Sequence, residues 1–412
     1  MEKKSGAEAL ILSLLAEGVD VMFGYPGGAI MPVYDALYHY SEKLKHILVR
    51  HEQGAIHAAQ GFARVSRRTG VCLATSGPGA TNLITGLADA MIDSTPLVCI
   101  TGQVASHLLG SDAFQETDVI GISMPVTKWS VQVTRACDIP SAVAKAFYIA
   151  SSGRPGPVLI DITKDAQFET TEFMYERCTG VRCYQPSPKL MKKQLEEAVK
   201  MIDASSRPYI LAGQGVLLAG AEKELVRFAE KISAPVACTL LGLSAFPPDH
   251  ELYVGMLGMH GNYAVNIQTN ECDVLIAVGM RFDDRVTGDL KSYARQAKII
   301  HIDIDASEIG KNVPTDIGLV CDAGEALREL QKACLPKAKT SWLDEFREAE
   351  ELEFNEVMQE ELFPESDGLR MAEVTRMLSE MTGGNAVIVT DVGQHQMVVS
   401  RYYKHRSRRG SI

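Results

Sequence analysis

The chain has 412 residues, more than a single hydrophobic core usually serves, so two or three domains are expected. Hydrophobic residues make up 46% of the chain and charged residues 23%, which is typical of globular proteins. The formal net charge of −11 disfavours a general nucleic-acid or anionic-membrane binder, and no apolar run approaches the length of a membrane span.

The N-terminal segment predicts an amphipathic helix and no signal peptide. Apolar residues recur at helical spacing between Ala7 and Leu15, and Glu8, Glu17 and Asp20 interrupt the N-terminal stretch as a whole. Ser5 is placed to cap this helix. The nine cysteines are scattered without a CxxC pair, so we expect reduced structural thiols and a cytoplasmic protein.

Residues 1–168 alternate helical segments with short apolar strands. The predicted strands are VDVMFGYPG, KHILVR, GVCLATSGPG, PLVCITGQV and GPVLIDITKD. Strands that end in glycine-rich loops and lead into helices predict a parallel α/β sheet. Residues 169–188 lack periodicity and end with two prolines, which predicts a linker.

A second α/β region covers residues 189–340. Its predicted helices are LMKKQLEEAVKMIDAS, AEKELVRFAEKI and AGEALRELQKAC, and its predicted strands are RPYILAGQG, APVACTL, CDVLIAVGMRF and AKIIHIDID. Residues 341–366 are strongly acidic and predict a helical connector. The fold class is therefore α/β, with consecutive parallel-sheet domains.

A third region, residues 367–412, begins with a predicted helix (GLRMAEVTRMLSEM) and a predicted strand (AVIVTDVGQ). One helix and one strand cannot form an independent core. We therefore expect that the chain is cut within its third domain.

The segment RHEQGAIHAAQGFAR (50–64) places one carboxylate, Glu52, at the start of a helix rich in small residues. Small residues allow close packing, so this carboxylate is expected to be partly buried. A buried carboxylate is costly unless a partner stabilises it. The sequence alone does not identify that partner.

Two glycine-rich turns, GYPGGAI (24–30) and TSGPGATN (75–82), each follow a predicted strand and precede a helix. Either turn alone is equally consistent with a tight βα connection, but two of them in one sheet favour a ligand crevice. DAFQE (112–116) lies in a third connection. There Phe114 and Gln115 are either site residues or, as is commoner, an exposed loop pair.

The second region carries weaker signals of a nucleotide site. GQG (213–215) resembles half of a dinucleotide fingerprint, but the third glycine position is Leu218. RFDDR (281–285) follows an apolar strand, as polar ligand sites do, although a solvated loop with internal salt bridges explains it too. Asp303 ends the next strand, where a carboxylate can bind a ribose hydroxyl, and His260 alone is more often structural. Spacing alone indicates a two-domain nucleotide-binding enzyme and no reaction type.

The chain resembles the large, catalytic subunit of acetolactate synthase (acetohydroxyacid synthase), a thiamine-diphosphate enzyme. The resemblance extends to about Met397 and rests on motifs that occur in the family's order: GYPGGAIMPVYDAL, RHEQGAIHAAQGFAR, TSGPGATNLITGLADAMIDSTPLV, ITGQV, GSDAFQETD, SGRPGPVLIDITKD, LGMHG, RFDDRVTG, HIDIDASEIGKN and DVGQHQM. The combination of DAFQE, RFDDRVTG and GQHQM is the most specific to this family.

The resemblance implies a transferase that decarboxylates pyruvate on thiamine diphosphate. The remaining two-carbon unit is joined to pyruvate or 2-oxobutyrate, giving 2-acetolactate or 2-aceto-2-hydroxybutyrate, on the way to valine, leucine and isoleucine. It also implies FAD, Mg²⁺, a homodimer or tetramer, and a possible regulatory small subunit, without a nucleic-acid or membrane partner. Residues 1–168 would bind the pyrimidine, residues 189–340 would bind FAD, and residues 367–412 would begin a diphosphate-binding domain.

Site residues carry over by motif. Glu52 would pair with N1′ of the aminopyrimidine, and Gly28 and Ala29 would lie beside the reacting carbons. Around the cofactor the resemblance places Pro78, Asn82, Gln115, Gln394 and His395. It assigns the substrate channel to Gln103, Phe114, Lys128 and Arg281, of which Arg281 would help to hold the acceptor carboxylate. The FAD positions are Arg154, Gly213, Gly215, Thr239, Leu240, Met259, His260, Gly279, Arg281, Asp283, Arg285, Asp303, Ile304, Asp322 and Ala323.

The sequence departs from the family pattern near its end. The family's third domain holds Mg²⁺ through a GDG motif and a later asparagine, and this chain contains no GDG. Val398 stands where a tryptophan is expected, and the basic tail RYYKHRSRRGSI loses the pattern. We therefore assign no metal ligand in this chain and expect the 412-residue chain by itself to be inactive.

Two alternatives remain open at the sequence level. Within enzymes, the rivals are another thiamine-diphosphate carboligase, such as glyoxylate carboligase, and flavin-dependent pyruvate oxidase. From a different class, a truncated chain could be a non-catalytic FAD-binding or oligomerisation module.

Overall fold

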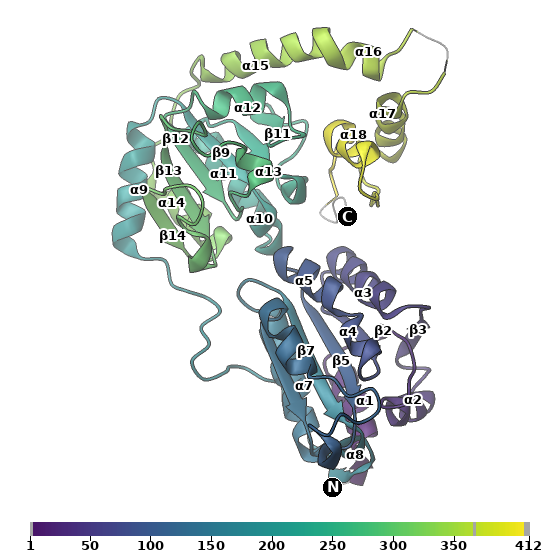
Figure 1. Ribbon diagram of the computed structural model, residues 1–412. Coiled ribbons are helices and arrows are strands. Elements are labelled where there is room, and N and C mark those ends of the chain that lie inside the picture. The colour runs from purple at the N-terminus through teal and green to yellow at the C-terminus, as the bar shows by residue number, and fades with distance from the viewer. Residues whose placement is uncertain (1–2, 366–367, 408–412) are drawn as a thin grey trace. The chain divides into compact units, whose positions relative to one another are not determined.

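The computed structural model describes residues 3–365 and 368–407 (Figure 1). The chain forms two compact units, Met1–Pro186 and Ser187–Ile412. The boundary between them falls within residues 169–188. In the described residues no helix is long and apolar enough to span a membrane, and all nine cysteines are free.

The first unit contains a six-stranded parallel sheet with the order β3-β2-β4-β5-β7-β6. Its strands are β2 (Val21–Gly24), β3 (Lys45–Leu48), β4 (Gly70–Ala74), β5 (Leu97–Gln103), β6 (Trp129–Val133) and β7 (Pro157–Thr163). The five predicted strands are confirmed. Strand β6 was missed because this edge strand is only partly buried and lacks a continuous apolar run.

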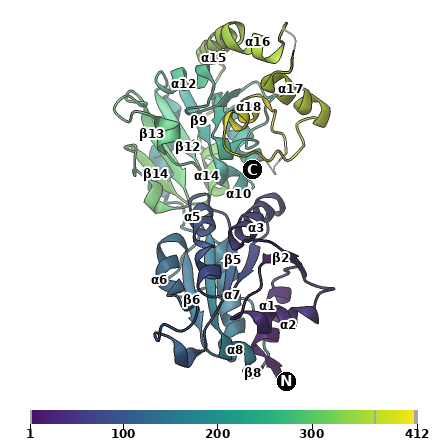
Figure 2. The ribbon, with the colours of Figure 1, turned by 45° about the vertical axis from the view of Figure 1, so that its right-hand side comes forward.

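Helices cover both faces of this sheet (Figure 2). They are α1 (Gly6–Ala16), α2 (Met31–Tyr38), α3 (Glu52–Ser66), α4 (Pro78–Thr81), α5 (Ile84–Ile92), α6 (Val119–Ser123), α7 (Ile139–Ser151) and α8 (Lys164–Phe168). The predicted cap of α1 is confirmed, because Ser5 Oγ accepts a hydrogen bond from the Glu8 N–H at 3.2 Å. Glu8 in turn accepts one from the Ser5 N–H, which completes a capping box.

Part of the segment predicted as a linker is a strand. β8 (Thr170–Glu172) pairs antiparallel with β1 (Lys3–Ser5). The partner lies at the opposite end of the unit's sequence, so local periodicity could not reveal this pairing.

The second unit contains another six-stranded parallel sheet, with the order β11-β10-β9-β12-β13-β14. Its strands are β9 (Pro208–Ala212), β10 (Val236–Cys238), β11 (Tyr253–Met256), β12 (Val274–Val278), β13 (Lys298–Asp303) and β14 (Ile317–Val320). The predicted class of consecutive parallel α/β sheets is confirmed. Strands β11 and β14 were missed, and each is a short strand at an edge of the sheet.

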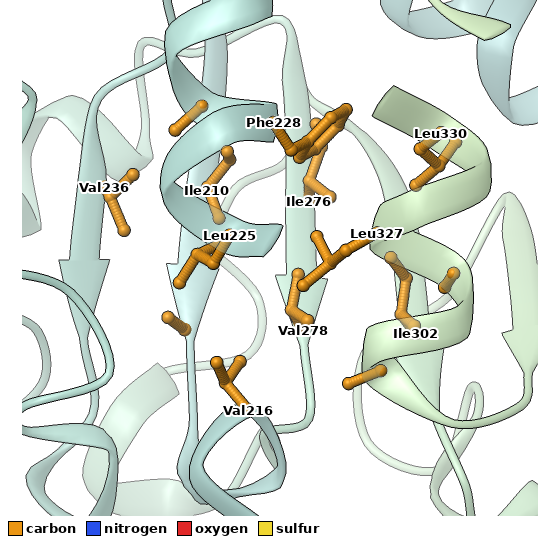
Figure 3. Packing of buried hydrophobic residues seen from close by; sticks show 14 of the residues in the cluster. Ile210, Val216, Leu225, Phe228, Val236, Ile276, Val278, Ile302, Leu327 and Leu330 are labelled. Carbon is orange, nitrogen blue, oxygen red and sulfur yellow. The ribbon is translucent and has the colours of Figure 1, made fainter. Parts of the chain in front are cut away.

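The helices of the second sheet are α9 (Lys192–Ala204), α10 (Gln214–Leu218), α11 (Glu222–Ile232), α12 (Tyr263–Thr269), α13 (Asp284–Thr287) and α14 (Ala323–Ala333). Helices α9, α10, α11 and α14 bury apolar side chains on one face, and α12 packs on the other. Figure 3 shows side chains of α11 and α14 over those of the strands: Leu225, Phe228, Leu327, Leu330, Ile210, Ile276, Val278 and Ile302.

The acidic connector is helical, as predicted. It comprises α15 (Trp342–Glu353), a π-helix (Phe354–Met358) and α16 (Gln359–Leu362), and α17 (Met371–Thr382) and α18 (Gln394–Tyr402) follow. The predicted strand AVIVTDVGQ is wrong, since residues 386–393 contain only an isolated bridge at Ile388 and Gln394 already begins α18. A strand needs a hydrogen-bonded neighbour, and no sheet of the described residues extends to this segment. Of the basic tail, residues 408–412 lie outside the described residues.

Phe228→Ala tests the core of the second unit. The Phe228 side chain is fully buried, so the substitution leaves a cavity and should lower the free energy of unfolding by about 3–5 kcal/mol. Urea denaturation followed by circular dichroism measures the loss. The control is Leu335→Ala, at a side chain that is 63% exposed, and its expected change is below about 0.5 kcal/mol. Equal losses in the two variants would contradict the observed packing.

Candidate active site

The strand order of the first sheet brings three predicted motifs together at the carboxyl ends of its strands. Strand β2 lies between β3 and β4. The chain therefore adds β3 on one side of β2 and then crosses over to add β4 on the other side. Ligands of parallel α/β sheets bind at the carboxyl ends of the strands, at such a switch point. Here the turns 24–30 and 75–82 follow β2 and β4, and Glu52 follows β3.

Glu52 is the first residue of α3 and is nearly buried, with 8% of its surface exposed. Its Oε2 accepts a hydrogen bond from Asn82 Nδ2 at 2.9 Å, which supplies the partner that the sequence did not identify. Its Oε1 accepts no hydrogen bond from the residues that the structure describes. One oxygen is thus held by the protein, and the other is left to bind a ligand.

The glycine-rich turns pack tightly against their neighbours. A Cβ on Gly27 would lie 2.5 Å from Thr75, and one on Gly77, whose φ is +54°, would lie 2.6 Å from the Gln115 carbonyl oxygen. In contrast, a Cβ on Gly28 would meet nothing within 4 Å. The turns therefore close on each other but leave open space at Gly28, where a ligand can approach the backbone.

The peptide groups of Ala29 are fixed by two side chains that the sequence analysis missed. Thr75 Oγ1 accepts a hydrogen bond from the Ala29 N–H at 3.2 Å, and Gln167 Nε2 donates one to the Ala29 carbonyl at 2.8 Å. Thr75 begins the motif TSGPGATN and could have been found there. Gln167 follows β7 in the chain, and no local pattern indicates it.

The loop DAFQE lies beside the second turn. Phe114 is 88% exposed, and Gln115 has a φ of +58°, which is unusual for a residue other than glycine. Glu116 stabilises the loop by accepting hydrogen bonds from the N–H groups of Gly110 and Ala113. These bonds lower the pKa of Glu116. Strained backbone of this kind is concentrated at functional sites.

Lys128 and Arg154 lie at the amino ends of the strands of this sheet, whereas Glu52 lies at the carboxyl ends. Lys128 precedes β6 and Arg154 precedes β7, so both stand where strands begin. The Lys128 ammonium donates to the carbonyl of Ser152 at 2.7 Å, and Arg154 Nε donates to Ser94 Oγ at 2.9 Å. Within the first unit, these two residues are therefore not brought together with Glu52.

The second sheet has its own switch point, between β9 and β12. A Cβ on Gly213 would lie 2.3 Å from the Gly279 carbonyl oxygen, and the Gly215 N–H donates to that oxygen at 2.8 Å. Gly279 itself has a φ of +57°. These glycines allow the turns after β9 and β12 to touch, so their first structural role is close backbone packing.

Polar side chains surround this switch point. Arg281 lies 4.0 Å from Asp283, which caps α13. Arg285 Nη1 lies 3.8 Å from Met259 Sδ, and the Asp303 carboxylate accepts a hydrogen bond from the Asp305 N–H. The remaining predicted residues lie in the segments that follow β10, β11, β13 and β14: Thr239, Leu240, His260, Ile304, Asp322 and Ala323. All of these segments emerge at the carboxyl edge of the sheet, as a nucleotide site requires.

Gln394 and His395 occupy the first turn of α18, at the end of the segment that was predicted as a strand. Among the described residues, no group of three or more His, Cys, Asp or Glu side chains is arranged to hold a metal ion.

Two protein families match the chain. Residues 4–122 match the family described as thiamine pyrophosphate enzyme, N-terminal TPP binding domain, and residues 195–330 match thiamine pyrophosphate enzyme, central domain. Each match falls on one of the two parallel sheets. The first contains Glu52, Asn82 and the turns around them.

Curated relatives cover nearly the whole chain. A probable acetolactate synthase large subunit of Methanocaldococcus jannaschii is 48% identical over 99% of this chain and 70% of its own length. The acetolactate synthase large subunit of Corynebacterium glutamicum is 47% identical over 97% of this chain and 64% of its own. That of Lactococcus lactis is 44% identical over 100% of this chain and 71% of its own. The chain therefore belongs to the acetolactate synthase large-subunit family of thiamine pyrophosphate enzymes.

Proposed function

We propose that the protein is a catalytic acetolactate synthase subunit that decarboxylates pyruvate and condenses the product with a second 2-keto acid. The observation that carries this proposal is Glu52, a nearly buried carboxylate with one oxygen bound by Asn82 and the other open to a ligand. It lies at the switch point of the domain that matches the TPP-binding family. The family membership of the chain supports the same activity.

The residues of the first site fit the pyrimidine half of thiamine diphosphate. When bound, this cofactor supplies the electron sink that decarboxylation of a 2-keto acid requires. Glu52 would hold a proton at the pyrimidine nitrogen through Oε1, while Asn82 keeps the carboxylate in place. Pro78 and Gln115 would flank the ring. Gly28 would allow the reacting atoms to approach the backbone, because the space beside it is open.

We propose that Arg281 and Phe114 take part in substrate recognition, with pyruvate and 2-oxobutyrate as acceptors. The substrate-channel roles of Gln103 and Lys128 stay predictions, because Gln103 is buried with both ends of its amide bound by protein groups. A guanidinium group presents a fork of donors that suits a carboxylate, which favours Arg281 for this part. Phe114 offers an exposed aromatic ring that can pack against the short alkyl group of a 2-keto acid. Lys128 and Arg154 lie at the amino ends of the strands, away from Glu52. The substrate role of Lys128 and the FAD role of Arg154 therefore stay predictions.

We propose FAD for the second unit. The switch point between β9 and β12, the arginines at positions 281 and 285, and Asp303 at the end of β13 support a dinucleotide there. Mg²⁺ is proposed as the partner of the cofactor's diphosphate, without an assigned ligand in this chain. A homodimer or tetramer, a regulatory small subunit and a cytoplasmic location remain proposals that rest on the family.

Glu52→Gln tests the proposed reaction. The protein, expressed from its complete gene, is incubated with pyruvate, thiamine diphosphate, Mg²⁺ and FAD, and acetolactate is measured after acid conversion to acetoin. The substitution removes the basic carboxylate and should lower kcat by at least about 100-fold. The exposed Glu42→Gln serves as the control and should retain full activity. Formation of tartronate semialdehyde from glyoxylate, or of acetyl phosphate from pyruvate, would favour the rival enzymes instead.

Asp303→Ala tests the flavin site. Loss of a charged hydrogen bond to a ribose hydroxyl should raise the Kd for FAD about tenfold. The matched control is Asp305→Ala in the same turn, where the carboxylate accepts a hydrogen bond from the Ser307 N–H. Titration of the flavin-free protein with FAD, followed by flavin fluorescence, measures both variants. An equal rise in the Kd for FAD in both variants would show that FAD binding depends on the conformation of the turn and that the Asp303 carboxylate makes no contact with the flavin nucleotide.

A further inference from the structure

Asp161 is a fully buried carboxylate in strand β7, where the residues on either side of it in the chain, Ile160 and Ile162, are apolar. The register pairs it with Thr101 of β5 on one side and with Gln132 of β6 on the other. Side chains alternate along a strand, so Gln103 lies on the same face of β5 as Thr101. This is also the face of Cys99, which belongs to the apolar cluster beneath α3 and α5.

Three neutral donors satisfy this carboxylate. Thr101 Oγ1 donates to Oδ1 at 2.6 Å, and Gln103 Nε2 and Gln132 Nε2 donate to Oδ2 at 3.1 and 3.0 Å. Burial raises the pKa of Asp161, and these hydrogen bonds oppose the rise because they favour the ionised form. A buried carboxylate is costly to maintain, and an apolar residue would suit a buried strand better. Its presence therefore calls for an account beyond stability.

The carboxylate fixes the orientation of the Gln103 amide. Besides Asp161, Gln103 Nε2 donates to the Thr117 carbonyl at 3.0 Å, and its Oε1 accepts a hydrogen bond from the Val104 N–H at 2.9 Å. A flipped amide would direct its carbonyl oxygen at the carboxylate and lose the bond to Thr117.

Thr117 ends the loop 112–117, whose contacts lead to the cofactor site. Gln115 in this loop lies so close to Gly77 that a Cβ on the glycine would stand 2.6 Å from the Gln115 oxygen. Gly77 belongs to the turn that delivers Asn82 to Glu52. A continuous series of contacts thus runs from the buried strand β7 to the carboxylate of the proposed active site.

We propose that Asp161 is a positioning residue that orients the Gln103 amide, ties loop 112–117 to the sheet, and so places Phe114 and Gln115 at the active site. This inference rests on the proposed function for its catalytic consequence. Asp161 itself touches neither of the two loop residues through its hydrogen bonds, and acts through Gln103.

Asp161→Leu tests whether this carboxylate holds loop 112–117 in place. The leucine side chain is similar in size but accepts no hydrogen bond, so the Gln103 amide loses the acceptor that orients it. Backbone amides of residues 112–117 should exchange with deuterium about tenfold faster, and the KM for pyruvate should rise about tenfold with a smaller change in kcat. A purely structural role would lower stability without selective loosening of this loop.

Gln103→Met removes the same hydrogen bond from the glutamine side and leaves Asp161 two donors, so it provides a test if Asp161→Leu fails to fold. It should loosen the same loop amides. The control is Asp165→Leu, which removes a carboxylate that accepts its hydrogen bonds from Ser106 instead, and it should leave the exchange of the loop unchanged. Wild-type exchange of residues 112–117 in both Asp161→Leu and Gln103→Met would overturn the proposal. A wild-type protein without pyruvate turnover would count against the proposed function alone, because the exchange measurement needs no activity.

Discussion

The parallel order β3-β2-β4 is the constraint on which the candidate site depends. Parallel strands end at one edge of a sheet, and their connections must emerge there. With β2 between the other two strands, segments that start at residues 24, 52 and 75 converge at one point. A carboxylate at the start of α3 can be buried at that point because Asn82, delivered by the neighbouring turn, donates a hydrogen bond to it.

Close backbone packing by glycine recurs at both switch points. In the first unit the turns press against Thr75 and Gln115, and in the second unit Gly213 and Gly215 press against Gly279. In each case a side chain would collide with main-chain or side-chain atoms within 3 Å. The glycine motifs thus determine how closely the turns approach each other. Space for a ligand is left at Gly28, where a Cβ would have no atom within 4 Å. Glycine-rich motifs of this kind serve packing as well as binding.

The polar row on β5, β7 and β6 shows how a buried strand can control a surface loop. Thr101, Asp161 and Gln132 occupy matched positions on three neighbouring strands, so backbone register sets their distances. Hydrogen bonds in such a dry environment are strong when satisfied and costly when broken. A rigid arrangement of this kind transmits the position of the sheet to the loop at Thr117 through a single amide, that of Gln103.

Much of this protein could be predicted from sequence because it depends on local pattern. The apolar strands, the helix cap at Ser5, the glycine-rich turns and the motifs that identify the family are all contained in short stretches of chain. The lone aspartate in VLIDIT was also visible, although nothing local gave it a role.

The tertiary structure decided what local pattern cannot encode. The partner of Glu52 lies 30 residues away, and the donors to Asp161 lie on two other strands. It also placed Lys128 at the strand ends opposite Glu52, and no sheet of the described residues includes the segment 386–393. The physical reason is the same in each case. Periodicity reports which way a side chain faces along its own element, whereas strand order and register determine which side chains meet across the fold.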